Sequence, residues 1–321
     1  MTHRAARIGL LTPAALIGGA ALAIAAHRPG LAGAAGPGFW LAAFLVWLAA
    51  TLAARDLAAL EPGTAAGRRL VRLAVPLLFG VLVLVLWEVV VVGAGVPAVL
   101  MPPPSAVAAR FATALPVLGA DFVQTCLKSA LPGYVIGCLS GLGVAILADR
   151  LPVLGRGLLP VANVASALPI VGIAPIMVMW FGFDWPSKAA VVAVMTFFPM
   201  LVQAGAGLAA TGSIERDLMR TYAAGYARTL LSLRLPMALP FLFTALKVNA
   251  TLALIGAIVA EFFGTPIVGM GFRISIEAAR LSLDMVWAEI VLAALAGSAF
   301  YGLIALAERA ATGWHPSVRA G

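Results

Sequence analysis

Long apolar runs recur through the sequence and constrain its fold more than any other feature. A helix of about 20 apolar residues is long enough to cross the hydrocarbon core of a bilayer. The runs are continuous rather than alternating, which argues against a barrel of membrane strands. With 63% hydrophobic and 11% charged residues among 321, the chain is too poor in charge for a soluble domain of this size. We therefore predict an all-α, polytopic membrane protein.

The apolar runs predict about eight membrane spans. They fall at residues 10–26, 39–54, 73–92, 122–148, 157–183, 189–210, 240–263 and 285–307. The first run has the charged start of a signal peptide, but we favour a retained span because another run follows at once. The first two form a hairpin. A polar linker follows it, so we predict two domains: residues 1–65, the hairpin and linker, and residues 66–321.

Three prolines, Pro160, Pro169 and Pro175, interrupt the fifth run. A broken membrane helix is tolerated where it faces protein or a water-filled cavity. The segment therefore either lines a pathway through the membrane or contains a packing kink.

The net charge of +8 would suit nucleic acid, but the basic residues stand at the ends of the apolar runs, as the positive-inside rule requires. With a cytoplasmic N-terminus and one crossing per run, most of the 21 Lys and Arg residues lie on the cytoplasmic side. We expect a multi-pass protein of the inner (plasma) membrane that contacts lipid and no nucleic acid. The same arrangement places residues 213–234 in the cytoplasm.

Motifs for catalysis and metal binding are missing. The sequence has no G-x-x-x-x-G-K-[ST] loop for ATP, no H-E-x-x-H and no G-x-S-x-G. Cys126 and Cys138 lie in apolar helical text without metal-ligand spacing and are interpreted as small core residues. We predict no catalytic residue, no metal and no cofactor in this chain.

Residues 213–240, SIERDLMRTYAAGYARTLLSLRLPMALP, form a polar interlude between apolar runs. Ile214, Leu218 and Tyr222 share one face of a predicted short helix. Ser213 is expected to cap its start, and Gly225 to end it in the left-handed conformation. Such an amphipathic helix lies on a lipid surface or inserts into a partner, whereas the pattern alone is equally compatible with an ordinary loop.

The sequence from Tyr222 to Gly225, with Leu235-Pro236 further on, resembles the cytoplasmic "EAA" loop of permeases from binding-protein-dependent ABC transporters. That signature is Glu-Ala-Ala, three residues, Gly and a spacer ending in a hydrophobic residue and Pro. Here residues 219–221, Met-Arg-Thr, replace Glu-Ala-Ala, so the acidic start is missing. Four other stretches look like the nitrate, sulfonate, taurine and pyrimidine-precursor branch of these permeases: residues 100–107, 167–183, 197–208 and 238–264. The whole resemblance covers about residues 72 to 312.

The resemblance implies the permease subunit of an importer, with a six-helix type I core that follows the N-terminal hairpin. Two copies would form the pore and move a small solute from periplasm to cytoplasm by alternating access. A separate ATPase would bind ATP and Mg, so this chain would not itself be an enzyme. A periplasmic or lipid-anchored binding protein would deliver the solute, which would be a sulfonate, taurine, nitrate or a pyrimidine-type thiamine precursor. The permeases for the pyrimidine-type precursor are the ones that the sequence resembles most. The residues implied in ATPase coupling are Ile214, Leu218, Tyr222, Ala223, Gly225 and Pro236.

A few polar residues inside the apolar runs are candidates for the translocation path, because charged groups in lipid usually face protein or an aqueous cavity. Glu261 either contributes to an outer gate or makes a structural hydrogen bond to a neighbouring span. Two residues near the proline breaks, Met177 and Trp180, either line the path or pack against their neighbours. The remaining candidates are Glu88, Lys247 and Asn249.

Two alternatives to an importer subunit, a secondary transporter and a membrane enzyme, would each require polar residues in a different arrangement. A secondary transporter would carry coupling charges at mid-membrane and would work without an ATPase. A membrane enzyme would need a cluster of polar residues, and the sequence does not reveal one.

Overall fold

A computed structural model describes residues 2–27, 35–60, 62–151, 153–154, 157, 169–264 and 267–313. Within these ranges the regular structure is helical, without β-strands. The helices long and apolar enough to cross a membrane are Pro37–Ala58, Ala65–Gly93, Leu115–Arg150, Trp185–Ala209, Tyr226–Glu261 and Leu283–Thr312. Two shorter apolar helices are Leu10–Ala26 and Val171–Phe181. The prediction of a polytopic all-α membrane protein is confirmed, while Pro160, in the fifth run, lies outside the described residues.

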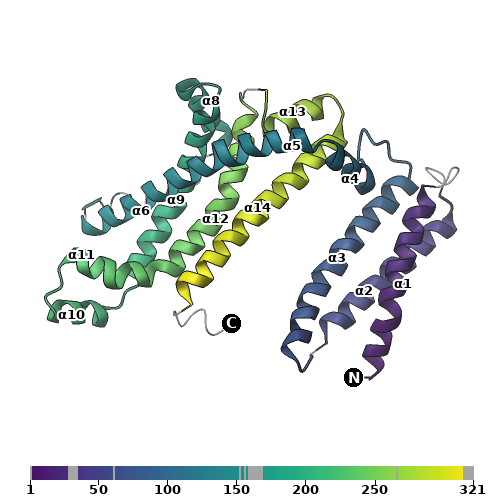
Figure 1. The fold of residues 1–321 in the computed structure, drawn as a ribbon, viewed down its shortest axis with the longest axis horizontal. Helices are drawn as coiled ribbons and strands as arrows, with labels where there is room; N and C mark the ends of the chain where they lie inside the picture. The colour runs from purple at the N-terminus through teal and green to yellow at the C-terminus, as the bar shows by residue number, and fades with distance from the viewer. Residues whose placement is uncertain are drawn as a thin grey trace. The chain divides into compact units, whose positions relative to one another are not determined.

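Contacts divide the chain into two units. The first contains Met1–Thr113 and Leu281–Trp287. In it, α1 (Thr2–Ala26) packs against both α2 (Pro37–Ala58) and α3 (Ala65–Gly93), and Figure 1 shows these three helices running side by side. The predicted hairpin is thus α1 and α2, with α3 packed on it. The domain boundary at residues 65 and 66 stays a prediction.

The short helix α4 (Pro104–Thr113) completes the first unit after the triple proline. Its first turn is held by Glu88 of α3, whose carboxylate accepts hydrogen bonds from the Ser105 amide (2.9 Å) and hydroxyl (2.7 Å). An anion is favourable at this position because the first amides of a helix have no partner within it.

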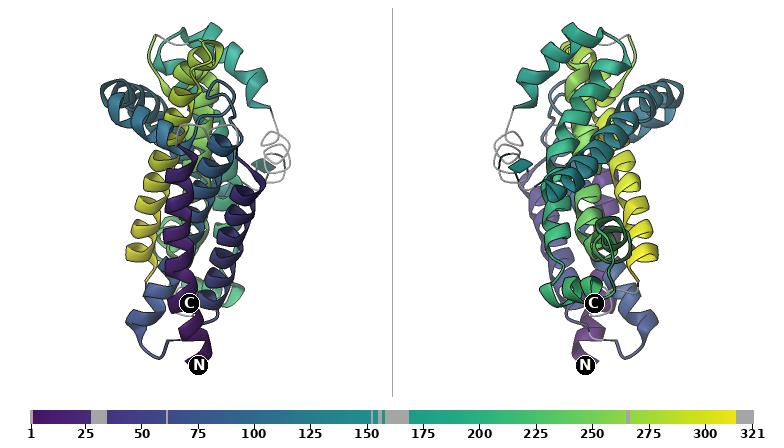
Figure 2. Two further views of the ribbon diagram at one scale, coloured as in Figure 1. Left: turned by 90° about the vertical axis from the view of Figure 1, so that its right-hand side faces the viewer. Right: turned by 90° about the vertical axis from the view of Figure 1, so that its left-hand side faces the viewer.

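The second unit contains Ala114–Arg280 and Ala288–Gly321. Its first long span is continuous through α5 (Leu115–Phe122), the π-helical segment η1 (Val123–Ala130) and α6 (Leu131–Arg150). The helix α8 (Ile170–Phe181) precedes α9 (Trp185–Ala209), and both pack against α12 (Leu235–Glu261). Figure 2 shows these helices from two further sides.

Glycines on α6 allow a close approach to α9. A Cβ at Gly137 would lie 2.0 Å from the Thr196 hydroxyl and 2.4 Å from the Ala193 carbonyl oxygen. Gly133 and Gly141 face α9 in the same way, because a Cβ at either position would lie 2.5 or 2.6 Å from a backbone oxygen of α9. Gly137 and Gly141, which are spaced as G-x-x-x-G, therefore pack against a helix of the same chain, as expected for small residues where membrane helices cross.

The segment after α9 leaves the apolar core and then returns to it. It contains α10 (Ser213–Thr221), α11 (Tyr226–Thr229) and the π-helical η2 (Leu230–Arg234), which leads directly into α12. Figure 1 shows α10 and α11 beyond the ends of α9 and α12. At the other end of α12, a loop leads to α13 (Met270–Ala279) and then to α14 (Leu283–Thr312).

Candidate functional site

The helix α10 carries exposed apolar side chains although it lies outside the spans. Ile214 is 82% exposed, Leu218 56% and Tyr222, at the helix end, 77%. None of the residues of α10 is buried. Its other face is charged, with Arg220 paired to Asp217 at 3.0 Å. Large apolar side chains gathered on one exposed face are typical of a surface that binds a partner or a membrane.

The ends of α10 differ from the sequence prediction. Gly212, not Ser213, is at the N-cap, and no side chain caps the helix. The helix ends at Thr221, and the left-handed residue is Ala223, with φ 50°. Gly225 has an ordinary φ of −67° and is the N-cap of α11 instead. The expected capping roles of Ser213 and Gly225 were therefore wrong: the helix starts one residue earlier than expected, and the turn that closes it falls two residues before Gly225.

Glu261 lies at the end of α12, 2% exposed, and accepts hydrogen bonds from two other segments. The Thr125 hydroxyl of η1 donates at 2.8 Å and the Gly271 amide of α13 donates at 2.8 Å. The structural alternative for Glu261 thus has direct geometric support. Its contribution to a gate stays a prediction.

Asp121 completes this polar cluster at the end of α12. Its carboxylate accepts from the Gly269 amide at 2.6 Å and from Arg273 Nε at 2.9 Å. The hydrogen bond to Asp121 raises the pKa of the Arg273 guanidinium above its ordinary value. Together with Glu261, Asp121 ties the α12–α13 loop to the α5–η1 span. Sequence reasoning did not connect these residues, because nothing in their spacing shows that they meet.

The remaining path candidates of the second unit also have partners within the protein. Lys247 pairs with Glu308 of α14 at 2.7 Å. The buried Asn249 amide donates to the Thr196 carbonyl oxygen at 2.8 Å and to Cys138 Sγ at 3.2 Å. These contacts join α12 to three neighbouring helices and give each side chain a structural role.

The last three candidates are described within their own units. Met177 is partly buried and packs against a core cluster that includes Ala174, whereas Trp180 is 69% exposed. Glu88 belongs to the first unit, where it holds α4 and pairs with His27 at 3.1 Å. Within the second unit, the described path candidates therefore have separate partners and do not form one polar cluster.

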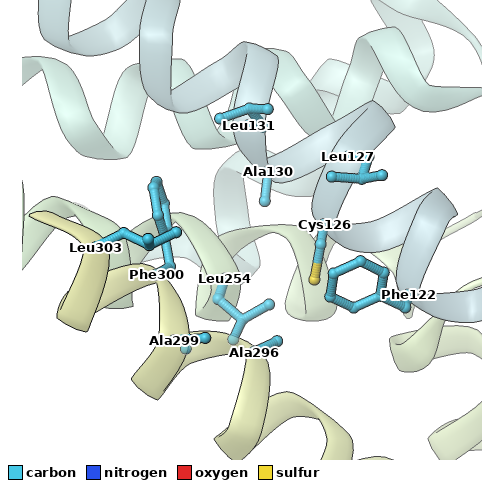
Figure 3. Close-up of a pocket in the computed structure, with 11 residues that line it drawn as sticks. Phe122, Cys126, Leu127, Ala130, Leu131, Leu254, Ala296, Ala299, Phe300 and Leu303 are labelled. Carbon is cyan, nitrogen blue, oxygen red and sulfur yellow. The ribbon is translucent and has the colours of Figure 1, made fainter.

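A cavity of about 280 Å³ lies between the α5–η1 span, α12 and α14. Figure 3 shows Phe122 and Cys126 on one side, Leu254 between, and Phe300 and Leu303 on the other. Its lining is apolar, so it offers no hydrogen bonds to a polar solute. Among the residues that the structure describes, no group of three His, Cys, Asp or Glu side chains is placed to hold a metal ion.

Comparison with known proteins gives a consistent result. The family described as "Binding-protein-dependent transport system inner membrane component" matches residues 133–313. The "Probable ABC transporter permease protein" of Haemophilus influenzae is 32% identical over 222 residues, which cover 69% of this chain and 90% of that protein. The riboflavin transport system permease protein RibX of Chloroflexus aurantiacus is 33% identical over 241 residues, covering 74% and 88%. The formylaminopyrimidine transport permease protein ThiX of Halalkalibacterium halodurans is 28% identical over 239 residues, covering 74% and 95%.

Proposed function

Because the chain belongs to the family of inner membrane components of binding-protein-dependent ABC transporters, we propose that it forms the pore of an ATP-driven importer, with α10 as its coupling helix. It is a multi-pass transport permease of the inner membrane. In our proposal two copies of the chain enclose the pathway. A separate ATPase binds ATP and Mg, and a periplasmic or lipid-anchored binding protein delivers the solute.

The exposed apolar face of α10 carries this proposal. An amphipathic helix that lays its apolar face into a groove is a common way for one protein to hold another. Ile214, Leu218 and Tyr222 supply such anchors, and the charged residues of α10 surround them. With the N-terminus in the cytoplasm, as the distribution of basic residues favours, α10 reaches the compartment that contains ATP. Movement of the ATPase pair then reaches the spans through α10, which supports alternating access.

The transported solute is proposed from the relatives. RibX and ThiX, which match about three quarters of this chain, are permeases for riboflavin and formylaminopyrimidine. Permeases for aliphatic sulfonates, taurine and bicarbonate match at 25%, 30% and 26% identity. We infer a small nitrogen heterocycle, in line with the pyrimidine-type precursor expected from the sequence, ahead of a sulfonate, taurine or nitrate.

Co-purification tests the coupling helix. The tagged chain is expressed with the ATPase of the same transport system, and wild type is compared with Leu218→Glu. A charge at the centre of the apolar face should weaken association by about 30-fold or more, because buried interface anchors contribute about 2 kcal/mol or more.

Arg216→Glu places the same side chain on the opposite face of α10 and is the matched control. We expect it to retain the ATPase. If the wild-type chain never binds an ATPase, the importer proposal fails and a secondary transporter becomes the better explanation. If Leu218→Glu binds as well as wild type, α10 is not the coupling helix.

A further inference from the structure

Three helix ends meet beside α10. Arg234, the last residue of η2, donates from Nη1 and Nη2 to the two carboxylate oxygens of Asp149 on α6, at 2.6 and 2.7 Å. The same guanidinium donates to the Leu208 carbonyl oxygen of α9, at 2.8 Å from Nη2 and 3.3 Å from Nε. One side chain therefore joins the spans that enter and leave α10, and joins both to α6.

The chemistry of this junction favours a fixed geometry. A two-point pairing between guanidinium and carboxylate fixes orientation as well as distance. The side chains are sheltered from water, with Arg234 12% and Asp149 20% exposed. Leu208 lies in the last turn of α9, where carbonyl groups lack a partner within the helix and a positive charge is favourable.

Tyr226 extends the junction to the exit of α10. It is the first residue of α11, and its hydroxyl lies 3.0 Å from Asp149 Oδ2 and 3.3 Å from the Ile146 carbonyl oxygen. The Arg150 guanidinium lies over the Tyr226 ring, 5.6 Å from its centre. The chain after α10 is thus attached directly to α6, and the chain before it is attached through Arg234, although α6 is far from α10 in sequence.

We propose that Asp149 and Arg234 are positioning residues for energy coupling: they hold the two segments that flank α10, the end of α9 and the η2 segment that leads into α12, to α6, so that a force on α10 moves these spans together. This inference depends on the proposed role of α10. The pair does not touch α10 itself, which joins its neighbours through residues 210–212 and 222–225. Without the pair, the segments that flank these two connections are no longer held to α6, and a push from the ATPase would displace them instead of moving the spans together.

The matched control is a second ion pair of the same unit. Lys247 and Glu308 join α12 to α14 at 2.7 Å, with side-chain exposures of 21% and 20%, close to those of the Asp149–Arg234 pair. This pair does not touch the α10 segment. A general loss of stability should affect both pairs alike, whereas a loss of positioning should follow only from the Asp149–Arg234 pair.

The experiment measures a distance between spin labels at Met219→Cys on α10 and Leu147→Cys on α6. The assembled complex with its ATPase is used, in a Cys126→Ser background, with ATP plus orthovanadate as the probe. In wild type we expect a narrow distribution that ATP does not change, because α10 and α6 move as one body. In Asp149→Asn we expect ATPase still bound, a broader distribution and an ATP-dependent shift that wild type lacks, while Glu308→Gln behaves as wild type.

Each outcome decides between the proposals. If the ATPase does not bind the unlabelled wild-type chain, the proposed function of α10 fails. If it binds and Asp149→Asn gives the wild-type distribution with and without ATP, the positioning role is refuted while the coupling helix stands. If Asp149→Asn does not fold, Arg234→Lys takes its place in the experiment, because lysine keeps the positive charge but cannot make the two-point pairing. The ATP-dependent shift of the distance must then appear in Arg234→Lys.

Discussion

Replacing Gly137 by Ala should destabilise the second unit, and the structure gives the size of the effect. The added Cβ would lie 2.0 Å from the Thr196 hydroxyl and 2.4 Å from the Ala193 carbonyl oxygen. An ordinary contact between such atoms needs about 3.4 Å or more, so α6 and α9 must separate locally by roughly 1 Å. Overpacking of this kind costs about 1–3 kcal/mol.

The same substitution has an opposing effect on the unfolded chain. Ala in a helix is favoured over Gly by about 0.5–1 kcal/mol. The net loss should be about 1–2 kcal/mol, which lowers the Tm by roughly 2–6 °C in a domain of this size. Because the clash involves a backbone oxygen, rotation of a side chain cannot relieve it.

Gly143, on the same helix, provides the control. A Cβ there meets nothing within 4 Å, so Gly143→Ala should be neutral or slightly stabilising. The assay is thermal unfolding of the purified protein in one detergent, followed by the loss of the monodisperse peak on size exclusion. Equal Tm values for the two variants would refute the close α6–α9 contact.

Two further predictions concern the polar cluster at the end of α12. Asp121→Asn should increase hydrogen exchange at the Gly269 amide by about tenfold, because a neutral acceptor replaces a charged one that also holds Arg273. Exchange mass spectrometry of the α12–α13 loop measures this, and unchanged exchange would contradict the assigned contacts. Glu289→Gln should raise stability by about 1 kcal/mol, because the fully buried Glu289 carboxyl lies beside Asp121, and an amide can donate to that carboxylate without placing a second negative charge beside it. A lower Tm for Glu289→Gln would show that its charge is needed.

Local sequence properties predicted the spans and the amphipathic face of α10 well. Apolar length determines which segments can cross a bilayer, and Ile214, Leu218 and Tyr222 share a face because of the helical period alone. Gly225 shows the limit of such reasoning. Its freedom to adopt a positive φ made it the expected end of the helix, but the closing turn places Ala223 there instead.

Contacts between distant residues could not be predicted in the same way. Asp149 and Arg234 stand at the ends of two apolar runs, where charged residues are common for reasons of topology. Glu261 was recognised as a charge in an apolar segment, but its partners Thr125 and Gly271 depend on how three segments pack. One sequence contains no signal for such pairings, because helical periodicity describes the faces of a helix and not which faces meet.

The π-helical segment η1 has a consequence for the whole span from Leu115 to Arg150. Asp121 lies before it and Gly137 after it. Each extra residue in a helix rotates the later residues by about 100° around the helix axis. The faces of the span before and after η1 therefore cannot be read from one regular helical wheel. Deleting one residue within η1 would restore regular winding but turn the glycine face away from α9 or the carboxylate away from the α12–α13 loop. The span therefore behaves as two helices with separate registers, and insertions or deletions there should be tolerated less than substitutions.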